Sequence, residues 1–268
     1  MIIGNKTFNE HHTYIMGILN VTPDSFSDGG THNTLDTALF HTQKMIEEGA
    51  DLIDVGGEST RPNYTKISDQ EEIERVVPII DAIKSRFDIP ISIDTYKSAV
   101  AEECFKHGTD LLNDIWGLKY DSNMGNVAKK YNVPCCLMHN RTDTNYSDDF
   151  IGDVIKDLKD SVTIANNCGI SNDKIILDVG VGFAKSLNQN LLIMKHLNEF
   201  KTLGFPILLG TSRKSMIGLT LDVPVTERVE GTIVTTVMAV QSQCMFVRVH
   251  DVLQNKRAID MTEAILNA

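Results

Sequence analysis

Short apolar runs alternate with longer segments of helical periodicity along most of the chain. The runs are rich in β-branched residues and lack polar alternation, as in parallel strands buried on both faces. They cover residues 14–19, 52–55, 91–94, 111–115, 133–138, 175–178, 206–209 and 246–250. Between them, apolar residues spaced three and four apart predict helices at 35–48, 69–86, 97–107, 122–131, 149–168, 188–200, 226–241 and 259–266.

Several residues mark where these helices are expected to begin and end. Asp69 with Glu72 resembles a capping box at the start of the second helix. Gly49, Gly108 and Gly169 stand where three helices should stop. Eight strands alternating with eight helices predict one (β/α)8 barrel over residues 1–268, with its active site at the C-terminal ends of the strands. A doubly wound open sheet is the alternative, because alternation alone suits both.

Charge and cysteine content narrow the partners and the compartment. The net charge of −11 argues against nucleic acid and anionic membrane as partners, since both need a basic face. Five cysteines, an odd number without a Cys-x-x-Cys pair, favour a reducing cytosol over disulfides or a zinc ribbon. The N-terminus lacks a signal-peptide core, and no apolar run approaches the ~20 residues of a membrane span. We therefore expect a cytoplasmic protein.

Polar residues follow nearly every predicted strand. In a barrel these strand ends share one face, so a run of eight favours a site over isolated hydrogen-bonding caps. The residues are Asn20, the segment 56–62, Asp94 with Thr95, Asn113 with Asp114, Met138 with His139, Asp178, the segment 211–214, and Arg248 with His250.

The chemistry of these residues indicates two kinds of ligand group. Arginine and lysine in an acidic protein point to an anion such as phosphate; the cationic or donor groups are Arg61, Arg213, Lys214, Arg248 and His250. Asp94, Asn113 and Asp178 could instead read the donor-rich edge of a planar heterocycle. Ile115, Met138 and Phe183 could wall a flat ring, although each alone is more often core.

Other motifs are weaker. Residues 180–186 superficially suggest a phosphate loop, but Ala184 stands where a Walker A glycine is required. The eight histidines show no zinc-ligand spacing. Cys135 and Cys136, adjacent in an apolar run, are expected to be buried rather than nucleophilic.

An unusually long polar loop follows the first predicted strand. Its string Asn-Val-Thr-Pro-Asp-Ser-Phe-Ser-Asp-Gly-Gly, residues 20–30, resembles the signature loop of dihydropteroate synthases, which join a dihydropterin to p-aminobenzoate in folate synthesis. Gly-Gly-Glu-Ser-Thr-Arg-Pro at 56–62 is a second specific match. Shorter matches follow in order: Ile-Asp-Thr at 93–95, Asn-Asp-Ile at 113–115, Asp-x-Gly-x-Gly-Phe at 178–183, Ser-Arg-Lys at 212–214 and Arg-Val-His-Asp at 248–251. The resemblance therefore covers the chain from about residue 15 to residue 252.

The resemblance implies a role for each matching residue. The pterin ring would be held by Asp94, Asn113, Asp178 and Lys214, with Ile115, Met138 and Phe183 around it. Pyrophosphate would be held by Asn20, Arg248 and His250, Asn20 acting through Mg²⁺, with Thr60 and Arg61 nearby. The p-aminobenzoate pocket would be framed by Phe26, Pro62, Ser212 and Lys214, with Gly210 and Arg213 also in the substrate site. Asp94, Lys214 and Arg248 would be catalytic, and the family implies a homodimer.

The implied reaction is SN1-like, with Mg²⁺ and basic residues stabilising departing pyrophosphate and Asp94 stabilising a pterin cation. Two departures from the family pattern are Val179 for proline and Ala184 for a frequent glycine.

Three alternatives are a methyltetrahydrofolate methyltransferase, a degenerate paralogue and a sugar-phosphate barrel. The methyltransferase would need neither the 20–30 loop nor Arg61, Arg248 and His250. The paralogue should have lost a key residue, and the sugar-phosphate barrel does not explain the loop strings.

The helix at 226–241 is apolar on more than one face, so it either packs internally or meets a second subunit.

Overall fold

The computed structural model describes residues 1–21, 31–58 and 66–268, with side chains from residue 35 onward in the second range. Eight parallel strands close into a barrel in the order β10-β3-β4-β5-β6-β7-β8-β9. They are β3 (Tyr14–Asn20), β4 (Leu52–Gly56), β5 (Ile91–Asp94), β6 (Leu111–Asp114), β7 (Cys135–Met138), β8 (Ile175–Asp178), β9 (Ile207–Leu209) and β10 (Phe246–Val249). The pairing of β10 with β3 confirms the predicted barrel and excludes the open sheet.

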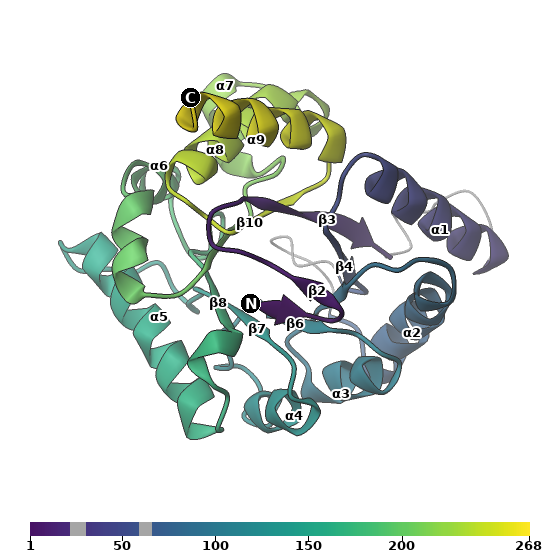
Figure 1. Ribbon diagram of the computed structural model, residues 1–268. Coiled ribbons are helices and arrows are strands. Elements are labelled where there is room, and N and C mark those ends of the chain that lie inside the picture. The colour runs from purple at the N-terminus through teal and green to yellow at the C-terminus, as the bar shows by residue number, and fades with distance from the viewer. Residues whose placement is uncertain (22–30, 59–65) are drawn as a thin grey trace.

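Helices form a ring outside the strands (Figure 1). They are α1 (Thr31–Glu47), α2 (Asp69–Arg86), α3 (Ser98–Lys106), α4 (Met124–Tyr131), α5 (Phe150–Asn167), α6 (Leu187–Lys195), α7 (Ser215–Leu221), α8 (Val229–Gln241) and α9 (Val252–Leu266). Among the described helices, none is both long and apolar enough to cross a membrane.

Side chains alternate between the two faces of each strand, which divides the core. In β4, for example, Ile53 and Val55 pack outward with the helices, whereas Leu52 belongs to a second cluster inside the barrel. Asp54 stands between the two outward residues and therefore points inward as well. The same parity operates in the neighbouring strands, so the interior is apolar near the N-terminal ends and polar near the C-terminal ends.

An N-terminal hairpin closes the apolar end of the barrel. β1 (Ile2–Ile3) and β2 (Lys6–Thr7) pair antiparallel, and Figure 1 shows them lying across the middle of the ring. The fully buried Ile3 and nearly buried Phe8 join the interior cluster of Leu111, Ile176 and Leu208. The sequence pattern did not predict this hairpin, because its strands are too short to show a period.

Several helix boundaries differ from the prediction. α7 was not predicted, and α9 begins at Val252 rather than at residue 259. Helix α2 is capped by Ser68, whose Oγ accepts a hydrogen bond from the Glu71 backbone N–H at 3.1 Å, so the predicted box of Asp69 and Glu72 is wrong. A capping box does occur at α6, between Ser186 and Gln189.

The three predicted glycine stops are confirmed. Gly49, Gly108 and Gly169 are each the second residue after a helix, and their φ values of 100°, 89° and 81° lie in the region that glycine enters without a steric penalty. Cys135 and Cys136 are fully buried, as expected.

The hairpin's contribution to stability is testable at Phe8, whose ring lies 4.8 Å from that of Tyr14 and 5.3 Å from that of Phe246. We expect Phe8→Ala to lower the free energy of unfolding by about 3–5 kcal/mol, because a buried aromatic ring is lost and a cavity remains. The matched control is Phe40→Ala on α1, where the ring is 64% exposed, and it should change stability by less than about 0.5 kcal/mol. Urea unfolding followed by circular dichroism measures both variants; a loss below about 0.5 kcal/mol in Phe8→Ala would show that the packing of Phe8 contributes little to stability.

Candidate active site

Strand register brings four positions of the polar barrel end into one row. Asn20 of β3 is paired with Gly56 of β4, Gly56 with Asp94 of β5, and Asp94 with Asn113 of β6. Gly56 has no side chain to separate its neighbours: a Cβ at that position would lie 3.7 Å from Asn20 Oδ1 and 3.8 Å from Asp94 Oδ2. The predicted residues Asn20, Asp94 and Asn113 therefore do share one face.

Arg248 crosses the barrel interior to two carboxylates. Its Nε donates to Asp54 Oδ2 at 2.6 Å, and its Nη2 donates to Asp94 Oδ2 at 2.7 Å. Asn113 Nδ2 donates to the same Asp54 oxygen at 3.1 Å. The sequence analysis missed Asp54. The available signal was a single carboxylate inside an otherwise apolar strand, which would be too costly to bury without a partner.

Two carboxylates facing one guanidinium leave the cluster short of positive charge. Burial raises the pKa of Asp94 to about 7, an effect that Arg248 opposes and Asp54 reinforces. Arg248 itself stays charged, because the carboxylates raise its pKa against the effect of burial. The second oxygens, Asp54 Oδ1 and Asp94 Oδ1, are buried and have no hydrogen-bond partner within residues 1–21, 31–58 and 66–268. Buried acceptors of this kind favour a ligand that brings N–H donors.

Asp178 and Lys214 lie on the other side of the polar end. Asp178 Oδ1 accepts a hydrogen bond from the Gly180 N–H at 2.7 Å, and burial raises the pKa of this carboxyl. Lys214 Nζ donates to the Val181 carbonyl oxygen. Burial lowers the pKa of Lys214 to about 8, while Asp178 opposes that shift. At Gly210 an added Cβ would lie 3.5 Å from Asp178 Oδ2, so glycine keeps the space beside this carboxylate open.

The predicted apolar walls also come together. Ile115, Met138 and Tyr96 form a small buried cluster, against which Phe183 and Trp116 pack. Lys214 Nζ lies 4.4 Å from the centre of the Phe183 ring, within cation–π range. Tyr96 and Trp116 were not singled out in the sequence, where nothing distinguishes them from core residues.

The rim of the site contains three more predicted residues, Ser212, Arg213 and His250. Ser212 Oγ accepts a hydrogen bond from the His250 backbone N–H at 3.1 Å and lies 3.0 Å from His250 Nδ1. Arg213 forms a two-pronged pair with Asp251, through Nε at 2.9 Å and Nη2 at 2.5 Å. Asp251 therefore holds the Arg213 side chain, and the Arg213 backbone N–H donates to Thr232 Oγ1 at 3.1 Å.

Comparison with known proteins gives a consistent result over nearly the whole chain. The model of the pterin-binding enzyme family matches residues 16–250. A dihydropteroate synthase of Clostridium beijerinckii is 59% identical over 99% of this chain and 99% of its own. The dihydropteroate synthase of Bacillus subtilis is 51% identical over 95% of this chain and 89% of its own.

Solved structures agree with the sequence matches. The dihydropteroate synthase of Clostridium difficile, determined in the presence of pteroic acid, aligns with a TM-score of 0.95 at 51% identity and covers 98% of this chain and 100% of that one. The Xanthomonas albilineans dihydropteroate synthase with 4-aminobenzoic acid has a TM-score of 0.92 at 37% identity, over 97% of this chain and 95% of its own.

The chain belongs to the dihydropteroate synthase family. The family predicted from the sequence motifs is thus confirmed, and with it the prediction of a transferase. The other predicted members of a dihydropteroate synthase site, Phe26, Thr60, Arg61 and Pro62, lie outside the described residues.

The described residues fit a metal ion that is held mainly by its substrate. They contain no cluster of three or more His, Cys, Asp or Glu side chains able to hold a metal. They do place Asn20 Oδ1 and Asp94 Oδ2 on either side of Gly56, where both oxygens lie within 3.8 Å of the position that a Cβ would take. Mg²⁺ prefers such oxygen ligands and completes its octahedron with phosphate oxygens and water, so a pyrophosphate substrate could supply the rest.

The unusual state of Asp94 leads to a prediction about stability and pH. Its pKa in the folded protein, about 7, lies above the usual 3.8, so between these values the folded state binds a proton that the unfolded state has lost. The stabilisation is full below about pH 4 and is lost as pH rises through about pH 7. We expect Asp94→Asn to remove this loss, so that wild-type stability falls relative to the variant over that range.

Urea unfolding at a series of pH values measures the difference. The exposed Asp148→Asn is the control for loss of one carboxyl group and should keep the wild-type profile. A wild-type profile in Asp94→Asn would contradict the assignment.

Proposed function

We propose that this protein condenses 6-hydroxymethyl-7,8-dihydropterin pyrophosphate with p-aminobenzoate, giving dihydropteroate and pyrophosphate. The observation that carries the proposal is the polar end of the barrel, where Asp54 and Asp94 each bury, beside Asn113, an oxygen that has no partner among the described side chains and backbone groups. A pterin ring carries amino and ring N–H groups along one edge and satisfies such acceptors. Asp178 and Lys214 extend this edge, and Met138 and Phe183 lie where a flat ring would pack.

The charges of the site suit an SN1-like reaction. When pyrophosphate leaves, the dihydropterin methylene becomes part of a delocalised cation, and the Asp94 carboxylate stabilises that charge electrostatically. Arg248 keeps Asp94 oriented through its Nη2 contact. That pairing and the contact with Asp54 use two of the five guanidinium N–H groups, which leaves others for an anionic substrate.

No strong base is needed for the second step. The p-aminobenzoate amine is a neutral nucleophile, and a cation requires little activation of its attacker. Ser212, with His250 against its hydroxyl, lies at the rim where this second substrate would enter. Asn20 would hold Mg²⁺, which supplies Lewis-acid stabilisation to the pyrophosphate oxygens when it is bound.

The proposed reaction and the proposed metal ligand can be tested in one assay. We expect the purified protein to release pyrophosphate and form dihydropteroate in equal amounts when both substrates and Mg²⁺ are present. Asn20→Ala should raise the Mg²⁺ concentration needed for half-maximal rate by about tenfold or more, because one of the few protein ligands is lost. Its KM for p-aminobenzoate at saturating Mg²⁺ should change little.

The exposed Asn9→Ala is the control for this assay and should behave as wild type. An unchanged Mg²⁺ requirement in Asn20→Ala would remove Asn20 as a ligand and leave the reaction standing. Pterin binding without turnover by the wild-type protein would instead indicate a non-catalytic pterin-binding protein.

We further propose a homodimer that pairs through the side of the barrel formed by α7, α8 and α9, which lie together in Figure 1. Large apolar side chains there are 47–67% exposed, more than a monomer usually concentrates in one region. They are Leu219, Leu221, Val225, Val234, Met261, Ile265 and Leu266. A two-fold axis through this surface would bury the same residues from both copies. The five cysteines are all free thiols, which supports the cytoplasmic location expected from the sequence.

A charge in this surface should separate the subunits. We expect Val234→Asp on α8 to convert the dimer to monomers, since an isologous contact would bury two unpaired carboxylates. Light scattering after size-exclusion chromatography measures the mass directly. Phe40→Asp, at an equally exposed position on α1, should remain dimeric; a Val234→Asp dimer would exclude this surface.

A further inference from the structure

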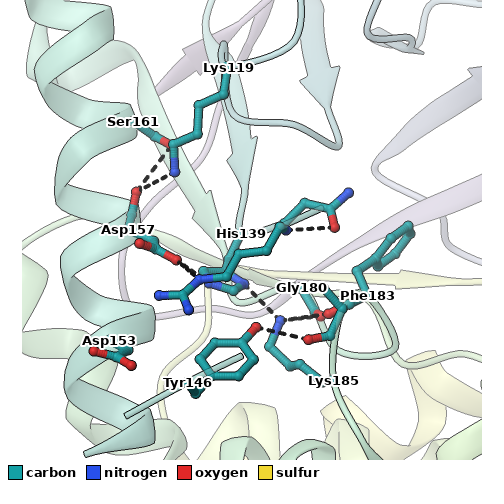
Figure 2. Close-up of polar contacts among 12 residues, drawn as sticks. Lys119, His139, Tyr146, Asp153, Asp157, Ser161, Gly180, Phe183 and Lys185 are labelled. Carbon is teal, nitrogen blue, oxygen red and sulfur yellow. Dashed lines mark hydrogen bonds and ion pairs between the residues drawn. The ribbon is translucent and has the colours of Figure 1, made fainter. Parts of the chain in front are cut away.

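The loop between β8 and α6 closes around the amino group of Lys185. Lys185 Nζ donates to the Gly180 carbonyl at 2.8 Å and to the Phe183 carbonyl at 3.1 Å, both in the same loop (Figure 2). Its third contact is His139 Nδ1 at 2.8 Å. An ammonium group has three N–H donors, so all three are engaged.

The imidazole that faces Lys185 belongs to His139, and Asp157 holds it in place. His139 has a fully buried side chain, and its Nε2 lies 3.0 Å from Asp157 Oδ2 on α5. Because Nδ1 accepts from Lys185, the ring proton is on Nε2 and is donated to Asp157. Burial lowers the pKa of His139 to about 4, which agrees with a neutral ring. Arg141 Nε also donates to Asp157, at 2.5 Å.

The two carbonyls held by Lys185 flank the groups that face the pterin site. Gly180 follows Asp178 and packs so tightly that an added Cβ would lie 1.9 Å from the His139 carbonyl oxygen. Between the two carbonyls is Val181, whose own carbonyl accepts from Lys214. The ring of Phe183 lies against Lys214 and the apolar wall. The loop conformation therefore sets where both Phe183 and Lys214 stand.

We propose that Lys185 is a positioning residue for the pterin site: its ammonium group, fixed by the His139–Asp157 pair, holds the β8–α6 loop in the shape that presents Phe183 and the Lys214 anchor to the substrate. The inference rests on the proposed function only in taking pterin as the ligand. Lys185 acts through the loop and does not touch the substrate itself.

This arrangement makes pterin binding sensitive to pH. A neutral amine has two N–H donors, so deprotonation of Lys185 breaks one of its three contacts. Burial lowers the pKa of Lys185 to about 7; Asp178 and Asp157 oppose the shift, whereas Lys214 and Arg141 favour it. Pterin affinity should therefore fall as pH rises through about 7. Lys214, with a pKa of about 8, adds a second and later loss.

The first test compares Lys185→Met with Lys195→Met, which removes an exposed lysine at the end of α6. We expect Lys185→Met to raise the Kd for 6-hydroxymethylpterin and the KM for the pterin substrate by about tenfold or more, since contacts from a charged donor are lost. The KM for p-aminobenzoate should rise less than the KM for the pterin substrate, because of the two positioned groups only Lys214 is also expected in the p-aminobenzoate pocket. Lys195→Met should match wild type. A Lys185→Met variant with wild-type pterin Kd and KM would overturn the proposal. A variant whose kcat falls and whose two KM values rise by the same factor would also overturn it.

A second test uses Lys185→Arg, which keeps a cation at every pH. The ratio of its pterin Kd to that of wild type cancels the ionisation of the probe. We expect the variant to restore pterin binding relative to Lys185→Met and to lose the first of the two alkaline steps, so that the decline begins near pH 8 rather than near pH 7. An alkaline profile identical to wild type would contradict the role of the Lys185 charge.

A third measurement needs no variant of Lys185. Long-range ¹H–¹⁵N spectra of the wild-type protein should show one buried histidine as the Nε2–H tautomer that does not titrate near neutral pH. A protonated Nδ1 at His139 would exclude the contact on which the proposal depends. Absence of pterin binding and turnover in wild type is a different result, which refutes the proposed function itself.

Discussion

The contact of Arg248 with Asp54 and Asp94 is the interaction on which the site depends. These three groups come from β10, β4 and β5, so the pairing joins β10 to strands that are not its neighbours in the barrel wall. Buried charges are tolerated only when they are paired, and one guanidinium does not fully satisfy two carboxylates. Burial raises the pKa of Asp94, Asp54 reinforces the shift, and two buried oxygens find no donor among the residues that the structure describes. A substrate that brings N–H donors to this end of the barrel would therefore satisfy these two acceptors.

The barrel tolerates this buried polar cluster because apolar side chains fill its other end. Ile3 and Phe8 of the hairpin cover a layer of apolar side chains that includes Leu111, Ile176 and Phe246. That apolar layer contributes hydrophobic stabilisation, whereas the polar layer nearer the C-terminal strand ends contains the candidate active-site residues. Strand parity produces the separation, since residues two apart on one strand face the same interior at different heights.

The walls of the site are held from outside the barrel as well. Asp157 on α5 fixes His139, which fixes Lys185 and through it the loop that bears Phe183. On the opposite side Glu58 accepts from the Ile67 N–H at 3.0 Å, from Lys97 Nζ at 2.7 Å and from Tyr96 at 2.5 Å. Preorganised groups of this kind need little rearrangement when a substrate binds.

The sequence alone identified the family, predicted the barrel ahead of an open sheet, and named many of the residues that the structure brings together at the polar end of the barrel. Buried parallel strands leave continuous apolar runs, and loop strings such as residues 20–30 are specific enough to identify the family. The tertiary structure decided what depends on distant partners. Asp54 became a site residue only when strand parity turned it toward Arg248, and Lys185 only when the loop folded back on it. The sequence around Asp54 and Lys185 does not identify these distant partners, because they are 194 and 46 residues away, at Arg248 and His139 respectively. The hairpin and α7 were missed for a related reason: their segments are too short for periodicity, and packing against the barrel stabilises them.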